Sequence, residues 1–179
     1  GLNVFWEERL VGQLQLDARQ RLVFQYDQGY LDGEKVHPLS LRLPLRREPY
    51  NDDTARPFFA NLLPEGDIRD HISKVLHVSK GNDFALLGEI GRECAGAVSI
   101  LPEGHAPLLS GDYLPLSNDE LENMIEGRER TPLLASRKDL RLSLAGAQDK
   151  LPVYISGDIM YLPAENAPSS HILKPQTRG

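Results

Sequence analysis

Short apolar runs separated by turns dominate the first fifty residues, and this spacing limits what the chain can fold into. Apolar residues alternate over Leu10–Leu16 and Leu39–Leu45, as in a strand with one buried face. Leu2–Trp6 and Leu22–Tyr26 are further short apolar runs. The 15 glycines and 13 prolines favour many short elements. We therefore predict two hairpin-like pairs of strands, the second of which joins Leu22–Tyr26 to Leu39–Leu45.

Helical spacing of apolar residues follows, and each helical segment begins near an aspartate that can cap it. The expected helices are 54–63 after Asp52 or Asp53, 68–76 after Asp67, and 84–90 after Asp83. A returning strand over 95–101 ends at Pro102. Residues 1–102 are thus predicted to form a β-rich module with three short helices.

The rest of the chain changes character twice. Residues 103–138 are predicted to be a linker, within which Ser117–Glu120 is a capping-box pattern that opens a short helix. Strand patterns return over 139–179, at 140–144, 151–155, 159–162 and 171–173. The predicted fold class is α+β, with the β-rich module first and a second β-rich region last.

Composition excludes several classes of protein. The net charge of -6 argues against a broad basic face for nucleic acid, and the cluster Arg42, Arg46 and Arg47 is more simply explained as solvated arginines. The single cysteine, Cys94, cannot form an internal disulfide, which fits a reducing compartment. No apolar run reaches transmembrane length. We expect a cytoplasmic protein.

Two segments suggest a nucleotide site. Leu142–Val153 runs from a strand through the small residues Ala145, Gly146 and Ala147 into a second strand, and small side chains let backbone N–H groups approach phosphates. On spacing alone, an ordinary hairpin turn remains the better explanation. Lys174 then ends an apolar strand, as does the phosphate-contacting lysine of kinases. A single strand-end lysine is usually solvated, but loop and lysine in this order favour a nucleotide site.

The amino-acid sequence resembles that of one family over essentially its whole length. The chain is similar to HipA-like serine/threonine kinases, the toxin half of a bacterial toxin–antitoxin pair. The matching segments are VFWEERLVGQL, PLSLRLPL, ARPFFANLLPEGDIRDHI, DFALLGEIGRECAGAVSILPEG, LSLAGAQDKLPV and SSHILKP.

The resemblance implies a role for each residue of the two segments. The resemblance implies that residues 139–179 are the start of a kinase-like N-lobe sheet. It also implies that the loop over ATP is formed by Ala145, Gly146, Ala147, Gln148, Asp149 and Lys150. Lys174 binds the phosphates, and Ser143 is an autophosphorylation site that silences the kinase. The family often has Glu where this chain has Asp149, which keeps the charge. Without the resemblance, Ser143 would be an ordinary strand serine.

The resemblance also implies what the chain lacks. Phosphoryl transfer needs a catalytic Asp, an Asn and a metal-binding Asp for Mg²⁺, which kinases place after the strand lysine, and this chain ends five residues after Lys174. We therefore expect an N-terminal portion that is inactive alone and holds no catalytic or metal-binding residue. The full protein would use ATP and Mg²⁺ to phosphorylate a protein hydroxyl. The family's example is glutamyl-tRNA synthetase, an aminoacyl-tRNA synthetase whose modification leads to growth arrest and persistence.

Two other functions remain open at this point. The family resemblance implies a HipB-like DNA-binding antitoxin as partner of the kinase. A non-catalytic, antitoxin-like interaction module of a split system is the main alternative to a kinase portion. A nucleic-acid binder is disfavoured by the acidic balance of the chain.

Overall fold

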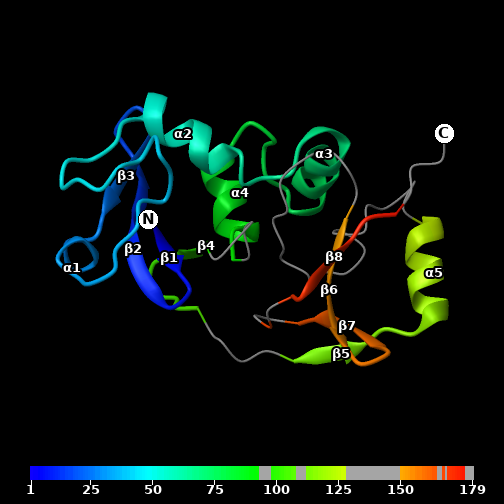
Figure 1. Cartoon of the computed structure of the whole chain (residues 1–179). Coiled ribbons are helices and arrows are strands. Elements are labelled where there is room, and N and C mark those ends of the chain that lie inside the picture. Colours follow the sequence, from blue (N-terminus) through cyan, green and yellow to red (C-terminus); the bar gives the residue numbers. More distant parts are fainter. Residues whose placement is uncertain (93–97, 108–111, 128–149, 165–166, 168, 176–179) are drawn as a thin grey trace.

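The chain forms two antiparallel sheets that lie side by side along its length (Figure 1). This computed structural model describes residues 1–92, 98–107, 112–127, 150–164, 167 and 169–175. The first sheet has the strand order β3-β2-β1-β4 and the second has the order β5-β7-β6-β8. The predicted α+β class is confirmed, because the helices lie against sheets whose described strands all pair antiparallel.

The first sheet is built from four short strands, of which β1 is central. Its strands are β1 (Leu2–Trp6), β2 (Arg9–Leu16), β3 (Leu22–Tyr26) and β4 (Val98–Pro102). In the register of β1, Leu2 lies opposite Leu14 of β2 and Val4 lies opposite Ile100 of β4. All four of these side chains are buried, so alternation along the strands supplies one continuous apolar face.

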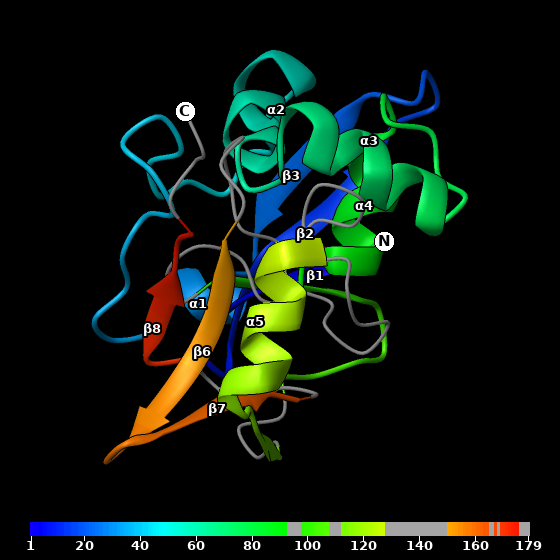
Figure 2. The same ribbon diagram turned by 90° about the vertical axis from the view of Figure 1, so that its right-hand side faces the viewer.

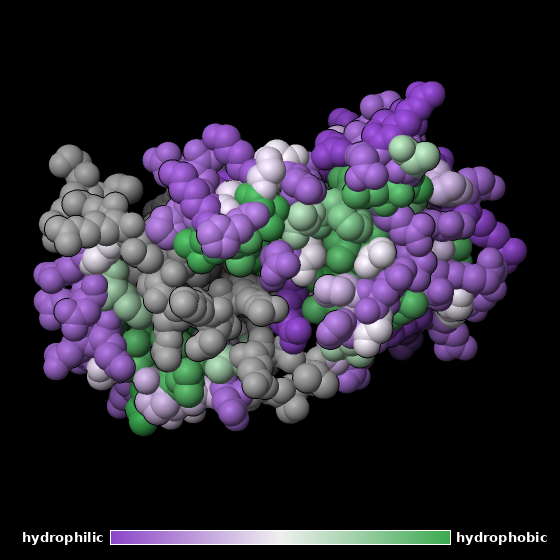
Figure 3. Space-filling view, turned by 180° about the vertical axis from the view of Figure 1, so that it is seen from behind, coloured by the Kyte–Doolittle hydropathy of each residue, from purple (hydrophilic) through white to green (hydrophobic). Residues whose placement is uncertain are grey.

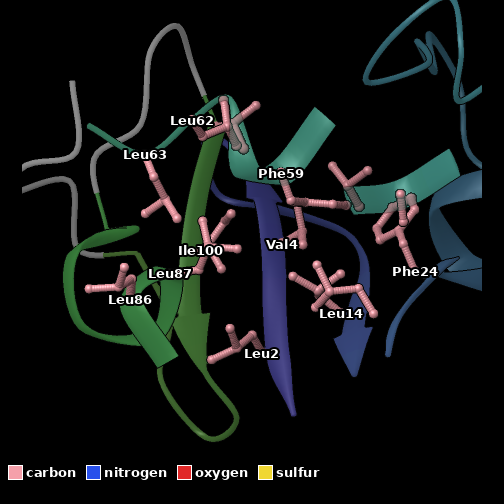
Figure 4. Packing of buried hydrophobic residues seen from close by; sticks show 14 of the residues in the cluster. Leu2, Val4, Leu14, Phe24, Phe59, Leu62, Leu63, Leu86, Leu87 and Ile100 are labelled. Carbon is pink, nitrogen blue, oxygen red and sulfur yellow. The ribbon is translucent and has the colours of Figure 1, made fainter. Parts of the chain in front are cut away.

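Helices cover that apolar face. They are α2 (Asp52–Ala60), α3 (Gly66–Val75) and α4 (Asp83–Ile90), while α1 (Gln28–Leu31) is a single turn after β3. Phe59 of α2 and Leu87 of α4 are fully buried, and Figure 4 shows them facing the strand residues Val4 and Ile100. Leu62 and Leu63, directly after α2, extend the same cluster. The three predicted helices and the returning strand are confirmed, with ends shifted by a few residues.

The predicted strand over Leu39–Leu45 is wrong. This segment is a loop with one isolated bridge between Ser40 and Leu43, and Leu41 is 97% exposed. Pro38 precedes the alternating leucines and Pro44 lies among them, and neither has an N–H group to donate to a neighbouring strand. Alternation alone therefore suggested a strand that the prolines prevent.

Tyrosine hydroxyls replace the missing strand partner for this loop. The Tyr26 hydroxyl accepts a hydrogen bond from the N–H of Leu39 at 2.9 Å and donates one to the carbonyl of Leu43. Tyr30 bonds His37 in the same two ways, and Tyr50 donates to the carbonyl of Pro44. The rings of Phe24 and Tyr26 meet edge to face at 4.9 Å. The loop is thus held by side chains that the first core orients.

A cluster of ion pairs joins the helices. Asp83 accepts hydrogen bonds from Arg56 of α2 at 2.7 Å and from Arg69 of α3. Arg56 also binds Asp52, which accepts a 2.6 Å bond from the N–H of Leu22 at the start of β3. These hydrogen bonds, chiefly those from Arg56, lower the pKa of Asp52. The cluster ties α2, α3, α4 and β3 into one unit.

The structure corrects the predicted caps of all three helices. Asn82, not Asp83, caps α4, because its side chain accepts from the N–H of Ala85. Asn51 is the N-cap of α2 and Glu65 that of α3, in place of the predicted aspartates, and neither makes a side-chain capping bond. The cap residues were misassigned because the carboxylates of Asp52 and Asp83 bind arginines instead.

The second sheet packs one face against a helix. Its strands are β5 (Tyr113–Pro115), β6 (Leu151–Ser156), β7 (Ile159–Pro163) and β8 (His171–Leu173), and α5 (Asn118–Gly127) lies in front of it in Figure 2. Leu121 and Met124 of α5 pack on Leu151, Val153 and Leu162. The predicted capping box is confirmed. The N–H of Glu120 donates to the Ser117 hydroxyl oxygen, and the N–H of Ser117 donates to the Glu120 carboxylate.

Surface properties of the described residues add two facts. Seen from behind, both parts of the molecule show hydrophobic patches among hydrophilic side chains (Figure 3). None of the helices in the described part of the chain has the length and apolar character needed to cross a membrane. The predicted domain boundaries at 102 and 138 stay predictions.

Removing the Tyr26 hydroxyl should destabilise the first module. Tyr26→Phe leaves the N–H of Leu39 and the carbonyl of Leu43 without their partner, at a cost of about 1–3 kcal/mol in the free energy of unfolding. Burial raises the pKa of Tyr26 to about 12 from 10.0. The stabilisation from the protonated hydroxyl is complete below pH 10 and declines toward pH 12. Urea unfolding across this range should show a weaker pH dependence for Tyr26→Phe than for the wild type.

Breaking the ion cluster should lower the free energy of unfolding more than breaking an exposed ion pair. Asp83→Asn removes the charge that Arg56 and Arg69 share, and we expect a loss of about 2–4 kcal/mol in urea unfolding. Asp70→Asn is the control, because Asp70 pairs with Lys80 at 3.1 Å on the exposed surface and should change stability by less than about 1 kcal/mol. Equal effects of the two variants would contradict this account.

Candidate functional site

Two lysines lie opposite each other at one end of the second sheet. In the antiparallel pairing of β6 and β8, Leu151 lies opposite Leu173 and Pro152 opposite Ile172. Continuing this register by one residue places Lys150, directly before β6, opposite Lys174, directly after β8. The structure therefore brings together two predicted site residues that are 24 positions apart in sequence.

The two lysines differ in their environments. The residue Lys150 is only 8% exposed, whereas Lys174 is exposed. Burial lowers the pKa of Lys150, and the nearby positive charge of Lys174 lowers it further, while Glu65 acts in the opposite direction. A buried ammonium group beside a second one is costly, and an anion placed between them would offset that cost. The pair is suited to bind a phosphate group.

The sheet face that carries the lysines also offers apolar surface. Residues two apart on a strand share a face, so Lys174 lies on the face of Ile172, and Lys150 on that of Pro152. Ile172 is 51% exposed, while the opposite face of the sheet packs on α5. A ligand with an anionic group and a flat apolar ring therefore finds both kinds of contact on one surface.

The remaining predicted site residues cannot be placed. Ser143, Ala145, Gly146, Ala147, Gln148 and Asp149 lie outside the described residues. The roles assigned to them therefore stay predictions. Cys94 also lies outside the described residues.

One residue near the site was missed by the sequence reasoning. Glu65 belongs to the turn between α2 and α3, yet it interacts with the charge of Lys150, 85 positions later. The sequence signals only a turn at Pro64–Gly66, and nothing local indicates a contact with the second sheet. In the described ranges, no three or more His, Cys, Asp or Glu side chains are grouped to hold a metal ion.

The arginine cluster of the first module has structural roles. Arg46 lies over the ring of Tyr50 at 3.7 Å and donates to the carbonyls of Glu48 and Pro49. Arg47 pairs with Asp32 at 2.9 Å. Two of the three arginines are therefore engaged within the module and not simply solvated.

Together, the fold and the site define an α+β protein. A module of one sheet and its helices comes first, and a second sheet follows in which Lys150 and Lys174 lie opposite each other at one end. The chain belongs to the HipA family, because the sequence model of the HipA N-terminal domain matches residues 2–101.

Individual relatives agree with this assignment. The chain is 42% identical to "Putative kinase Y4mE" of Sinorhizobium fredii over 97% of its own length and 43% of that protein. It is 32% identical to the serine/threonine-protein kinase toxin HipA of Shewanella oneidensis, over 97% of this chain and 39% of the toxin. The chain thus spans less than half the length of these curated relatives.

Two further matches are informative. A solved Shewanella oneidensis complex of HipA, HipB and operator DNA contains a chain with a TM-score of 0.74 and 29% identity, covering 96% of this chain and 40% of that one. An uncharacterized protein of Haemophilus influenzae is 32% identical over 56% of this chain and 91% of its own length. Both long and short proteins therefore resemble this sequence.

The charge of Lys174 should be measurable at Lys150. Lys174→Met removes a nearby positive charge and should raise the pKa of Lys150 toward its ordinary value of 10.5, although burial keeps it lowered. Nuclear magnetic resonance of labelled lysine ammonium groups across a pH titration would report this. Lys80→Met, which removes a lysine on the exposed surface of the first module, is the control. An unchanged Lys150 titration in Lys174→Met would show that the lysines are not neighbours.

Proposed function

We propose that this chain is the N-terminal portion of a HipA-type serine/threonine kinase toxin and that its second sheet binds the phosphates of ATP. The observation that carries the proposal is the paired position of Lys150 and Lys174 at one end of β6 and β8, with Lys150 buried. Cationic side chains that converge beside an exposed apolar strand residue, Ile172, fit a nucleotide.

Electrostatics supports a phosphate ligand over a neutral one. Burial and the neighbouring Lys174 both disfavour the charged form of Lys150 in the free protein. A triphosphate brings several negative charges, which would favour the charged form and reduce the repulsion between the lysines. Binding should therefore be stronger for ATP than for adenosine, because adenosine offers only the apolar contact.

The wider activity is proposed from the relatives. The full protein would transfer the γ-phosphate of ATP to a protein hydroxyl in the cytoplasm, with Mg²⁺ bound alongside the phosphates, and an aminoacyl-tRNA synthetase is the proposed substrate class. Relatives of this chain carry the names of kinases, and the solved neighbour is assembled with HipB on operator DNA. We infer a HipB-like antitoxin as partner, growth arrest and persistence as the outcome, and silencing by phosphorylation of Ser143.

A non-catalytic interaction module is the second candidate. The match to a short Haemophilus influenzae protein, of which 91% aligns, supports it, because a protein of that length resembles little more than half of this chain. Such a module would bind a separate kinase chain and would not need the paired lysines. Binding of a HipA-type kinase by this chain, without affinity for ATP, would favour this candidate.

The test is ATP binding by the full-length protein. Isothermal titration with ATP and Mg²⁺ should show binding by the wild type, and Lys174→Met and Lys150→Met should each weaken it at least about tenfold, as expected for loss of a charge-assisted contact. Lys80→Met, far from the second sheet in sequence and exposed, should bind like the wild type. No affinity in the wild type, or equal affinity in all variants, would refute the proposed function.

A further inference from the structure

We propose that a tyrosine cluster on the second sheet, formed by Tyr113, Tyr154 and Tyr161, binds the base of the nucleotide, which stacks on the ring of Tyr154. This inference rests on the proposed function and deepens it, because it places the base on the same surface as the paired lysines. It also sets the direction in which the nucleotide lies, with its phosphates at the lysine end and its base at the tyrosines.

The three tyrosines come from three strands and share one face of the sheet. In the pairing of β6 and β7, Tyr154 lies opposite Tyr161. Pro115 of β5 also lies opposite Tyr161, and Tyr113, two residues before Pro115, therefore points to the same side. The ring centroid of Tyr154 lies 4.2 Å from that of Tyr113 and 6.2 Å from that of Tyr161. The three rings form one cluster with Tyr154 in contact with both neighbours.

The tyrosines lie on the face that α5 does not cover. Val153, directly before Tyr154, is buried in the core that α5 closes, and so is Leu162, directly after Tyr161. Because side chains alternate along a strand, the tyrosines point away from that core. All three are partly exposed. The cluster therefore offers ring surface to a ligand.

The cluster and the paired lysines lie in line on this face. Pro152 of β6 lies opposite Ile172 of β8, and Tyr154 follows Pro152 by two residues, so Ile172 and Tyr154 are diagonal neighbours. Lys174 lies two residues beyond Ile172 on the other side. At about 3.3 Å per residue, about 13 Å of sheet separates the level of Lys174 from that of Tyr154. An extended nucleotide spans this length, with its ribose over Ile172, which is 51% exposed.

Stacking is the contact that such a cluster can make with a base. Every nucleobase has a π-face that stacks on an aromatic ring, and the neighbouring rings hold the side chain of Tyr154 in place. Stacking does not read the hydrogen-bonding edge of the base, so the cluster should accept guanine as well as adenine. Cross-strand aromatic pairs also stabilise sheets, and the experiment must therefore separate binding of the base from stability.

The experiment titrates the full-length protein in the presence of Mg²⁺ with ATP and, separately, with inorganic triphosphate, which carries the charges of ATP without a base. Tyr154→Leu should raise the Kd for ATP at least about fivefold, as for loss of a base–aromatic stack, and leave the Kd for triphosphate unchanged. Tyr154→Phe keeps the ring and should bind ATP like the wild type. Phe58→Leu, which removes a partly exposed ring from the first module, is the matched control and should bind both ligands like the wild type.

A second measurement needs no substitution. Nuclear Overhauser effects between the protons of bound adenine and those of a tyrosine ring are expected in the complex of the wild type with ATP, and the same protein should bind GTP with a Kd close to that for ATP. This measurement decides the question even where Tyr154→Leu fails to fold.

The inference and the proposed function fail in different ways. Unchanged ATP affinity in Tyr154→Leu, equal weakening of ATP and triphosphate, or the lack of adenine–tyrosine Overhauser effects would overturn the inference and leave the proposed function standing. A wild-type protein that binds neither ligand would refute the proposed function, and the inference with it.

Discussion

The carboxylate of Asp83, held between Arg56 and Arg69, is the interaction on which the arrangement of the molecule depends. Each partner comes from a different helix, and Arg56 reaches on to Asp52 at the start of α2. A buried carboxylate without partners would cost several kcal/mol, so the three helices can approach only in the geometry that satisfies it. That geometry also fixes the turn between α2 and α3, which carries Glu65.

The second sheet differs, because its most buried charged residue, Lys150, has another lysine as a neighbour. Asp83 has two cations for one carboxylate, whereas burial and the nearby charge of Lys174 both lower the pKa of Lys150. Cores select against such an arrangement unless it serves a ligand, since burial disfavours the ammonium form. The Asp83 cluster is therefore best explained by stability, whereas the paired lysines are the part of the described structure that best suits an anionic ligand.

Sequence reasoning succeeded where a single element determines the outcome. Alternation identified β2, short apolar runs identified β1 and β3, and the Ser117–Glu120 spacing identified the start of α5. It failed over Leu39–Leu45, where prolines and distant tyrosine hydroxyls decide the backbone partners, and at Asp83, whose arginines come from other helices. Lys174 could be proposed from its place at the end of a strand and Lys150 from the family resemblance, but Glu65 could not, because its effect on Lys150 depends on how distant parts of the chain pack.

A consequence follows from the reciprocity of coupled sites. If a partner that binds the first module changes the affinity for ATP, then ATP must change the affinity for that partner by the same factor. A shift of α3 relative to α4 would break the ion pair of Arg69 with Asp83, which is mostly buried. A partner that moved α3 would therefore have to offset the loss of that ion pair as well as make contacts of its own.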